Sequence, residues 1–468
     1  MKIFLYLSLI KIYFSLDFNP LPKENGILNS QYAHNTTNNL YFIFEHFRHG
    51  ARSPCNGGFI DYKDDLGGKW DNYGSLTKLG AKQHYLLGLR NRKYYDGFIS
   101  REYNSNEIRV YCSNYNRTMM SAQAQLLGFY NKIDFKNIQK NDDIIGEEKI
   151  SNKVNLQGII PPINLFLNMQ EDKQKFEIAF REKFKCPFLK EMIEKNIKNI
   201  DKLETFNKLN NIKEKIVSNY LGIILKEFEI KTYPVNYTTI YTFCDIFICS
   251  YFDEENNKKR FYNIEKKYKN FNSTELLGIC YNYLFEKFYK VEGAEYSKEN
   301  SVITMSKILK SMINFMELRI NKSQEYIGYE SPKFVLYSGH DDTLTQIQLF
   351  LNQFFNINLE WVPFASNQIF EIRKYGNTFY VEVYYNEKLK MNITFNEFSE
   401  IIKKSIMSEV EIEKKCYGFI RSPYFLRIFI LILLFIFMII FYIVMKIYYC
   451  YKNESLKINK PPKIVLVE

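Results

Sequence analysis

The sequence predicts an α/β fold: a mixed sheet flanked by helices, with an inserted helical segment and one apolar helix near the C-terminus. Two observations support this prediction. Short apolar runs, which are typical of buried strands, alternate with longer stretches whose apolar residues recur every three or four positions. The apolar runs at 40–44, 108–113 and 334–339 are each followed within a few residues by Arg or His. Charged side chains at strand ends are typical of a binding site in an open α/β sheet.

Length and charge narrow the class of protein. The 468 residues suffice for two to three domain-sized units. Lys and Arg number 63 against 52 Asp and Glu, which gives a formal net charge of +11. The lysines are scattered through the middle of the chain and its C-terminal tail, and they form no basic stripe. We therefore expect no nucleic-acid partner.

The N-terminal segment, residues 1–16, is typical of a secretory signal peptide. Lys2 precedes an apolar run from Ile3 to Ile10, which matches the charged and apolar regions of such peptides. Lys11 interrupts the pattern and the cleavage site is indistinct, so a buried N-terminal strand is the alternative.

The C-terminal region contains a candidate membrane-spanning helix at residues 426–445. It includes an uninterrupted apolar run from Ile428 to Met445, which is close to the length that crosses a bilayer as a helix. Tyrosines lie at its ends, and lysines are denser after it than before it. The positive-inside rule then makes residues 446–468 a cytoplasmic tail and residues 396–425 a stalk on the other side. A buried core helix is the alternative, but no nearby element could cover so apolar a cylinder.

A signal peptide and one C-terminal helix describe a type I membrane protein whose large N-terminal part lies outside the cell or in a lumen like that of a lysosome or vacuole. Seven of the eight cysteines then fall on the oxidising side, so disulfides are expected, with the pairing open and one thiol left over. A glycoprotein is also expected, because sequons on that side occur at Asn35, Asn236, Asn272, Asn321 and Asn392.

No Cys or His spacing suggests a metal site, and a homodimer is compatible with the sequence.

The chemistry centres on the stretch Arg48-His49-Gly50-Ala51-Arg52-Ser53-Pro54, which follows the first apolar run. Gly50 allows a sharp turn just past the strand end. Arg48 and Arg52 present planar forks of donors that match phosphate oxygens, and a histidine between them can attack a bound phosphorus atom. The stretch resembles the RHGxRxP signature of the histidine acid phosphatases, which belong to the histidine phosphatase superfamily. A surface loop that happens to spell the motif is the alternative.

Two downstream segments resemble further parts of that family. Residues 74–84 resemble a helix start of the pattern GxLTxxGxxQ, with Thr77 as the expected N-cap, and we assign this helix no chemistry. The run 108–113 leads to Arg117 at the start of another helix, where free backbone N–H groups also favour anions. The resemblance makes Arg117 a third phosphate ligand. The family often has Asp immediately before this arginine, whereas this sequence has Asn116, which puts the orientation of the guanidinium in doubt.

The middle of the chain, residues 142–330, is predicted to be mostly helical. Charged residues are dense there, and apolar residues recur at helical spacing in 276–288 and 303–318, among other stretches. The segment resembles the helical domain that the family inserts over its sheet and that sets substrate choice. Residues 30–141 and 331–395 then form the two parts of the α/β phosphatase core.

The last chemical element is His340-Asp341, which follows the apolar run 334–339. It resembles the family's second signature, a strand followed by His-Asp, although a simple turn is the alternative. By that resemblance His340 contacts the phosphate and Asp341 donates a proton to the leaving group. Asp342 is an uncommon second carboxylate, and its effect on Asp341 stays open.

Two closing strands are predicted after this element, at 363–372 and 378–385, with a hairpin turn at Tyr375-Gly376-Asn377. They also resemble the family. The resemblance therefore covers residues 39–385, strongly at both signatures and weakly between them.

The resemblance implies a membrane-anchored acid phosphatase that hydrolyses small phosphate monoesters through a covalent phosphohistidine. His49 is the expected nucleophile and Asp341 the expected proton donor, and the expected phosphate ligands are Arg48, Arg52, Arg117 and His340. No metal or cofactor is expected, because fixed arginine charges can stabilise the transferred group. Two alternatives stay open: an enzyme specialised for inositol polyphosphates or lysophospholipids, and an inactive receptor or adhesion ectodomain of the same fold.

Overall fold

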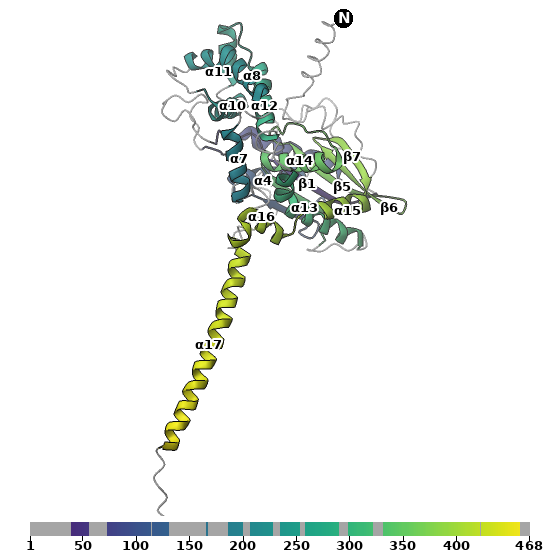
Figure 1. Cartoon of the computed structure of the whole chain (residues 1–468). Coiled ribbons are helices and arrows are strands. Elements are labelled where there is room, and N and C mark those ends of the chain that lie inside the picture. The colour runs from purple at the N-terminus through teal and green to yellow at the C-terminus, as the bar shows by residue number, and fades with distance from the viewer. Residues whose placement is uncertain are drawn as a thin grey trace, which may run out of the picture. The chain divides into compact units, whose positions relative to one another are not determined.

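The structure is a computed structural model, and it describes residues 39–55, 73–113, 115–130, 165–166, 186–199, 206–227, 235–252, 258–289, 298–321, 331–421 and 423–458 (Figure 1). The predicted signal peptide and the sequon at Asn35 lie outside the described residues. The chain divides into two compact units. The first comprises Met1–Lys185 and Lys190–Ile406, and the second comprises Cys186–Leu189 and Met407–Glu468.

The first unit is built on one mixed sheet, whose described strands lie in the order β3-β2-β4-β1-β5-β6-β7. Its parallel half consists of β1 (Leu40–Arg48), β2 (Ile108–Cys112), β3 (Leu165–Phe166) and β4 (Phe334–Gly339). In the register, the last residues of β1 and β2 pair with the last two residues of β4. The three apolar runs that the sequence singled out therefore end side by side at one edge of the sheet. The predicted α/β class is confirmed.

The antiparallel half extends the sheet from β1 through β5 (Asn367–Tyr375), β6 (Thr378–Tyr385) and β7 (Lys388–Thr394). Strand β6 has the predicted bounds, whereas β5 begins later than predicted. The first hairpin turns at Gly376, with a φ of 60°, as expected of a tight turn. The second turns at Asn386 and Glu387, and strand β7 beyond it was not predicted.

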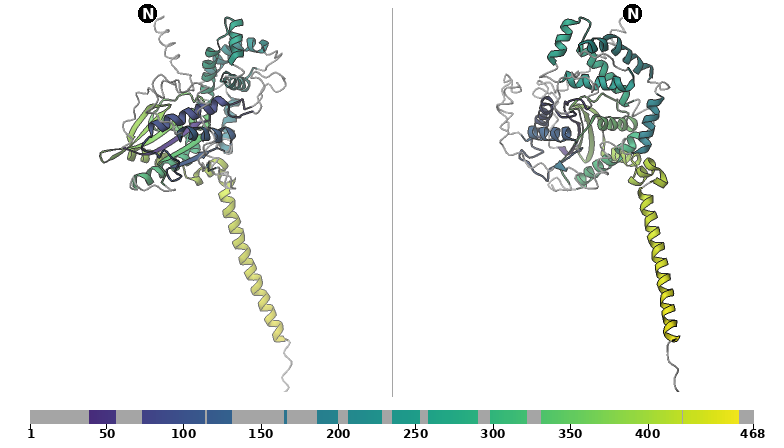
Figure 2. Two further views of the ribbon diagram at one scale, coloured as in Figure 1. Left: turned by 180° about the vertical axis from the view of Figure 1, so that it is seen from behind. Right: turned by 90° about the vertical axis from the view of Figure 1, so that its left-hand side faces the viewer.

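One face of the sheet is covered by α3 (Lys78–Tyr94) and α4 (Asn116–Phe129). Ile43 and Phe47 of β1 share a hydrophobic core there with Phe129. In Figure 2, the blue helices α3 and α4 lie on one side of the strands and the green helices lie on the other.

The opposite face is covered by α13 (Lys298–Asn321) and α14 (Asp341–Phe355). Phe42, on the opposite face of β1 from Ile43 because strand side chains alternate, packs against Phe315 of α13. We expected residues 303–318 to belong to the inserted helical segment. The structure places them in α13 against the sheet instead, since an amphipathic helix has the same spacing whichever core it covers.

Between α4 and α13 the described residues are mostly helical, as the spacing predicted. These elements are α7 (Pro187–Lys198), α8 (Phe206–Ile216), the π-helical turn Val217–Leu221, α9 (Gly222–Glu227), α10 (Tyr237–Tyr251), α11 (Lys258–Lys267) and α12 (Ser273–Phe285). Residues of α8, α10 and α12 share one hydrophobic core with Ala51, Trp361 and Phe364. Because Ala51 lies just beyond β1, these helices cover the edge of the sheet where the parallel strands end.

The folded core of the first unit extends beyond the boundary predicted at residue 395. Helix α15 (Phe395–Ser405) follows β7 directly and buries Phe398 and Ile402. Phe398 packs against Phe370 of β5. Residues 396–405, which we expected in the stalk, are therefore part of the core.

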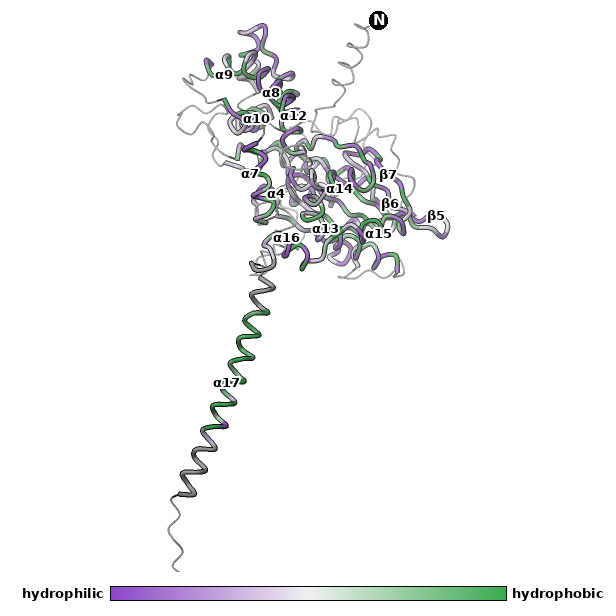
Figure 3. The backbone as a smooth tube through the Cα atoms, in the orientation of Figure 1, coloured by the Kyte–Doolittle hydropathy of each residue, from purple (hydrophilic) through white to green (hydrophobic). Residues whose placement is uncertain are grey.

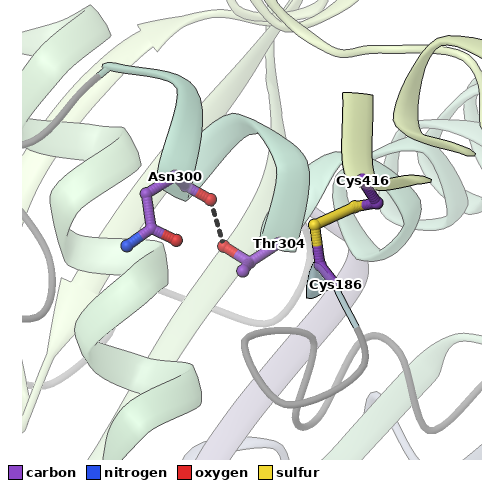
Figure 4. Close-up of a disulfide and its surroundings, with 4 residues drawn as sticks. All are labelled: Cys186, Asn300, Thr304 and Cys416. Carbon is purple, nitrogen blue, oxygen red and sulfur yellow. Dashed lines mark hydrogen bonds between the residues drawn. A yellow bond between two sulfur atoms is a disulfide. The ribbon is translucent and has the colours of Figure 1, made fainter. Parts of the chain in front are cut away.

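The second unit contains α16 (Glu409–Arg421) and the long helix α17 (Pro423–Ile458). A disulfide joins Cys186 to Cys416, at a sequence separation of 230 residues (Figure 4). Within the described residues, Ile428–Tyr449 in α17 is the one stretch long and apolar enough to cross a membrane (Figure 3). Its side chains are exposed. The helix continues to Ile458, so the first part of the predicted tail is helical.

Candidate active site

The site is built on the tight loop that follows Arg48, the last residue of β1. Two glycines make backbone contact here: a Cβ on Gly50 would lie 2.3 Å from the carbonyl oxygen of Gly80. Thr77 caps α3, as predicted, by accepting the Gly80 N–H, and its hydroxyl donates to the Ala51 carbonyl. The loop is therefore fixed against the start of α3, and only glycine fits at position 50.

His49 lies just past the end of β1 and is buried. Its Nδ1 is 2.8 Å from the carbonyl oxygen of Gly50. Because a carbonyl only accepts, Nδ1 carries the hydrogen, and Nε2 of the neutral ring keeps a lone pair. Burial lowers the pKa of His49 well below its ordinary value, and the positive charges of Arg117 and Arg48 lower it further. The imidazole is therefore neutral, which is the form that can act as a nucleophile.

Arg48 joins the two sequence motifs. Its Nη2 lies 2.8 Å from Oδ2 of Asp341, and its Nη1 donates to the Val362 carbonyl at 2.6 Å. The guanidinium also stands over the ring of Phe364, 4.3 Å from the ring centroid. Oδ1 of Asp341 accepts the backbone N–H of Asp342 in the first turn of α14. The carboxylate of Asp341 therefore faces the end of β1.

Arg52 pairs with Asp245 of α10, a residue that the sequence analysis did not single out. Nη2 and Nη1 lie 2.8 and 3.3 Å from the two carboxylate oxygens of Asp245. Nη1 also donates to the Ser53 carbonyl and to Cys249 Sγ. Asp245 is the only charged residue in α10, whose other residues are apolar, aromatic, hydroxyl-bearing or cysteine. This isolation is the signal by which the sequence could have identified it, because a lone acid in such a helix needs a partner.

Arg117 and His340 contact each other. Arg117 Nη2 lies 3.3 Å from His340 Nδ1. A guanidinium only donates, so Nδ1 accepts and the neutral ring carries its hydrogen on Nε2, which lies 2.8 Å from Ser113 Oγ. Arg117 also donates to the Gly74 carbonyl and lies over the ring of Tyr115. These contacts orient the guanidinium although the preceding residue is not Asp.

The structure brings the six predicted site residues together. The ring centroids of His49 and His340 lie 5.5 Å apart, and the charges of all three arginines act on His49. We use the name cup for the group Arg48, His49, Arg52, Arg117, His340 and Asp341. The individual roles of these residues remain predictions.

Two buried arginine donors of the cup have no acceptor among the described residues. Arg48 and Arg52 are 4% and 5% exposed, and the Nε–H of each has no hydrogen-bond partner among the described residues. Buried donors without an acceptor are destabilising, and binding of a ligand is one reason for a protein to retain them. Within the described residues, no group of three or more His, Cys, Asp or Glu side chains forms a set of metal ligands.

The chain was then compared with known proteins. A family described as the histidine phosphatase superfamily (branch 2) matches residues 47–386, which include both sequence motifs. The chain belongs to this superfamily. Lysosomal acid phosphatase of Rattus norvegicus is 25% identical over 354 residues, which cover 75% of this chain and 71% of the relative. Human prostatic acid phosphatase is 23% identical over 393 residues, or 81% and 82% of the two chains.

This histidine phosphatase is therefore a phosphoric monoester hydrolase of the acid phosphatase type, as its two motifs predicted. Its fold resembles that of the phytase from Citrobacter braakii, with a TM-score of 0.51, 15% identity, and coverage of 79% of this chain and 98% of the phytase. An apo form of Hafnia alvei phytase gives a TM-score of 0.50 at 11% identity. At such identities the likeness concerns the fold alone.

Proposed function

We propose that this histidine phosphatase is a membrane-anchored acid phosphatase that hydrolyses small phosphate monoesters through a covalent phosphohistidine at His49. The phosphate ligands in this proposal are Arg48, Arg52, Arg117 and His340. Asp341 is the proton donor. The fixed arginine charges take the part that metal ions have in other phosphoryl-transfer enzymes, which is to stabilise the equatorial oxygens of the transferred group.

In the first step, Nε2 of His49 attacks phosphorus in line with the ester bond. The N–P bond forms as the P–O bond to the leaving group breaks, and Asp341 gives its proton to the departing oxygen. A phosphate that binds Arg48 competes with Asp341 for that guanidinium, which frees the carboxyl group for proton transfer. The Gly50 carbonyl, already bonded to Nδ1, stabilises the positive charge that the phosphorylated ring acquires.

In the second step, a water molecule attacks the phosphohistidine. Asp341, now a carboxylate, accepts a proton from the water as the new P–O bond forms and the N–P bond breaks. The products are inorganic phosphate and a neutral His49. The same side chain thus acts as acid in one step and as base in the next.

The observation that carries this proposal is the state of the His49 ring. It is neutral, its Nδ1–H donates to the Gly50 carbonyl, so that Nε2 keeps its lone pair, and the charges of three arginines act on the ring. An ectodomain that binds a ligand without hydrolysing it does not need both a nucleophile and a proton donor. The same observation therefore favours an enzyme over an inactive receptor of this fold.

The proposal is tested by assaying the full chain in detergent at acidic pH. We expect wild type to hydrolyse both β-glycerol phosphate and p-nitrophenyl phosphate, and we expect His49→Ala to hydrolyse neither. Absence of phosphate release by wild type from any phosphomonoester would contradict the proposal and support the inactive ectodomain.

We also infer a type I topology with the cup on the luminal or extracellular side. The Cys186–Cys416 disulfide lies N-terminal to the apolar helix and requires an oxidising compartment. Truncation before Arg427 removes Ile428–Tyr449, the candidate span. We expect the truncated chain to be secreted as a soluble, active enzyme. Retention in the membrane fraction would place the anchor elsewhere, and a soluble but inactive product would give the helix a role beyond anchoring.

A further inference from the structure

We propose that Asp245 determines the substrate class of this enzyme. The carboxylate of Asp245 forms an ion pair with Arg52 and so lowers the net positive charge of the cup. The remaining charge then suits one phosphate group and not several. The preferred substrates are then monophosphates whose leaving groups are uncharged or cationic, and polyphosphorylated molecules such as inositol polyphosphates are disfavoured. The proposal rests on the phosphatase function proposed above.

Asp245 occupies one whole edge of the Arg52 guanidinium. Its two oxygens bond to Nη2 and Nη1, and Nη1 is further engaged by the Ser53 carbonyl and Cys249 Sγ. The Nε–H has no partner among the described residues, and it shares the other edge of the guanidinium with the second hydrogen of Nη2. Asp245 therefore fixes which edge of Arg52 a phosphate can reach.

The carboxylate of Asp245 consequently lies close to the phosphate that Arg52 would hold. One hydrogen bond on each side of a guanidinium separates the two oxygens by roughly 5–6 Å. The side chains of Arg52 and Asp245 are 6% and 16% exposed, so water screens their charges only partly. At that separation and exposure, one negative charge weakens the binding of another by on the order of ten-fold.

Asp245 belongs to the helices that cover the ends of the parallel strands. The six cup residues come from strand ends and helix starts of the α/β core, whereas Asp245 comes from α10. Phe252, which follows α10 directly, packs against Phe364, the residue that lies under Arg48. In this proposal, a substrate whose phosphate binds Arg52 lies close to the carboxylate of Asp245.

A second arginine of the cup also has a carboxylate partner. Arg48 is paired with Asp341. Three lysines of α8 and α11 form ion pairs with glutamates: Lys208 with Glu286, Lys215 with Glu275 and Lys267 with Glu227. In this proposal, a leaving group that carries its own phosphates is repelled by Asp245.

The test compares kcat/KM for β-glycerol phosphate and for phytate in wild type and Asp245→Asn, using the full chain in detergent. We expect wild type to prefer glycerol phosphate. The phosphate held by Arg52 is common to both substrates, so its repulsion by Asp245 cancels in the ratio. Repulsion of a further phosphate of phytate at a similar distance is lost in Asp245→Asn, which should raise the phytate-to-glycerol-phosphate ratio by about ten-fold. Glu214→Gln removes an exposed acid of α8 that bonds to Asn210 and lies outside the cup, and it should leave the ratio unchanged. Equal losses on both substrates in Asp245→Asn would overturn the proposal, because they would show that Asp245 only positions Arg52.

A second variant covers the case in which Asp245→Asn does not fold. Asp245→Glu keeps the charge and the partner of Arg52, so the ratio should stay within about two-fold of the wild-type value or fall below it. A rise of the ratio towards phytate in this variant would overturn the proposal. A wild-type enzyme that hydrolyses neither substrate would instead contradict the proposed function, so the two failures are distinguishable.

Discussion

His46 and His49 lie three residues apart, and both are buried and neutral, yet their surroundings differ. Burial alone lowers the pKa of His46 to about 3, and its ring lies near that of Tyr337 inside the sheet layer. Around His49, burial acts together with Arg117, Arg48, His340 and Arg52. Burial makes a histidine neutral in either place. Only the ring among guanidinium groups can also attract the anion that a neutral nucleophile would attack.

The largest effect that tests this comparison is expected from His49→Ala. We expect kcat to fall by on the order of 10⁴-fold or more, because the covalent step loses its nucleophile. The melting temperature should stay close to that of wild type, since the substitution removes a desolvated ring from among positive charges. Steady-state kinetics and thermal unfolding of the purified chain measure both. Activity within ten-fold of wild type would mean that His49 is no more catalytic than His46.

A smaller and more selective effect is expected from Asp341→Asn, with Asp342→Asn as its matched control. Asparagine keeps the shape but cannot donate a proton. Transfer from an alkyl phosphate should slow by about 10²–10⁴-fold, the usual worth of a positioned acid. Transfer from an activated aryl phosphate should slow far less, because that leaving group needs no proton. Single-turnover measurements on both substrates separate the two cases.

The control should behave differently. Asp342→Asn is expected to show little dependence on the leaving group and to move mainly the acidic side of the pH–rate profile, since it removes one nearby negative charge. If the rates on both substrates fall equally in both variants, the two carboxylates only shape the start of α14. If only Asp342→Asn shows a dependence on the leaving group, Asp342 and not Asp341 is the proton donor.

The smallest effect concerns stability and is tested at His46. The unfolded chain takes up a proton on this histidine below its ordinary pKa of 6.5, whereas the folded chain stays neutral down to about 3, so acid favours unfolding. Relative to His46→Leu, wild type should lose roughly 2 kcal/mol of unfolding free energy between pH 6.5 and pH 5. Denaturant titrations at several pH values measure this. His46→Leu should keep the kcat/KM of wild type. If the unfolding free energy changes equally with pH in both proteins, His46 is not the neutral buried group inferred here.

The parts of the fold that could be predicted from the sequence are those fixed by local signals. The strands that end at Arg48, Cys112 and Gly339 are short apolar runs, and each is followed by a motif residue. The cap at Thr77 and the turn at Gly376 also depend only on their neighbours in sequence. Most of the cup follows from such signals, because parallel pairing brings these strand ends together.

What could not be predicted depends on tertiary placement. The pairing of Asp245 with Arg52 arises only because α10 packs over the end of β1. The residues around Asp245 in the sequence do not predict which basic residue it pairs with. Helix α13 has the same apolar spacing as the helices of the inserted segment, so spacing could not assign it to the sheet. Strand β7 alternates weakly between Lys388 and Thr394 and is recognisable only from its pairing with β6.

The most direct test of the central claim is to trap the covalent intermediate. Wild-type enzyme is mixed with a ³²P-labelled alkyl phosphate, quenched in alkali within the first turnover, digested, and the labelled peptide sequenced. We predict acid-labile, base-stable phosphate on the peptide that contains His49, and none in His49→Ala. Phosphate on a serine, or turnover by wild type without label at His49, would contradict the account.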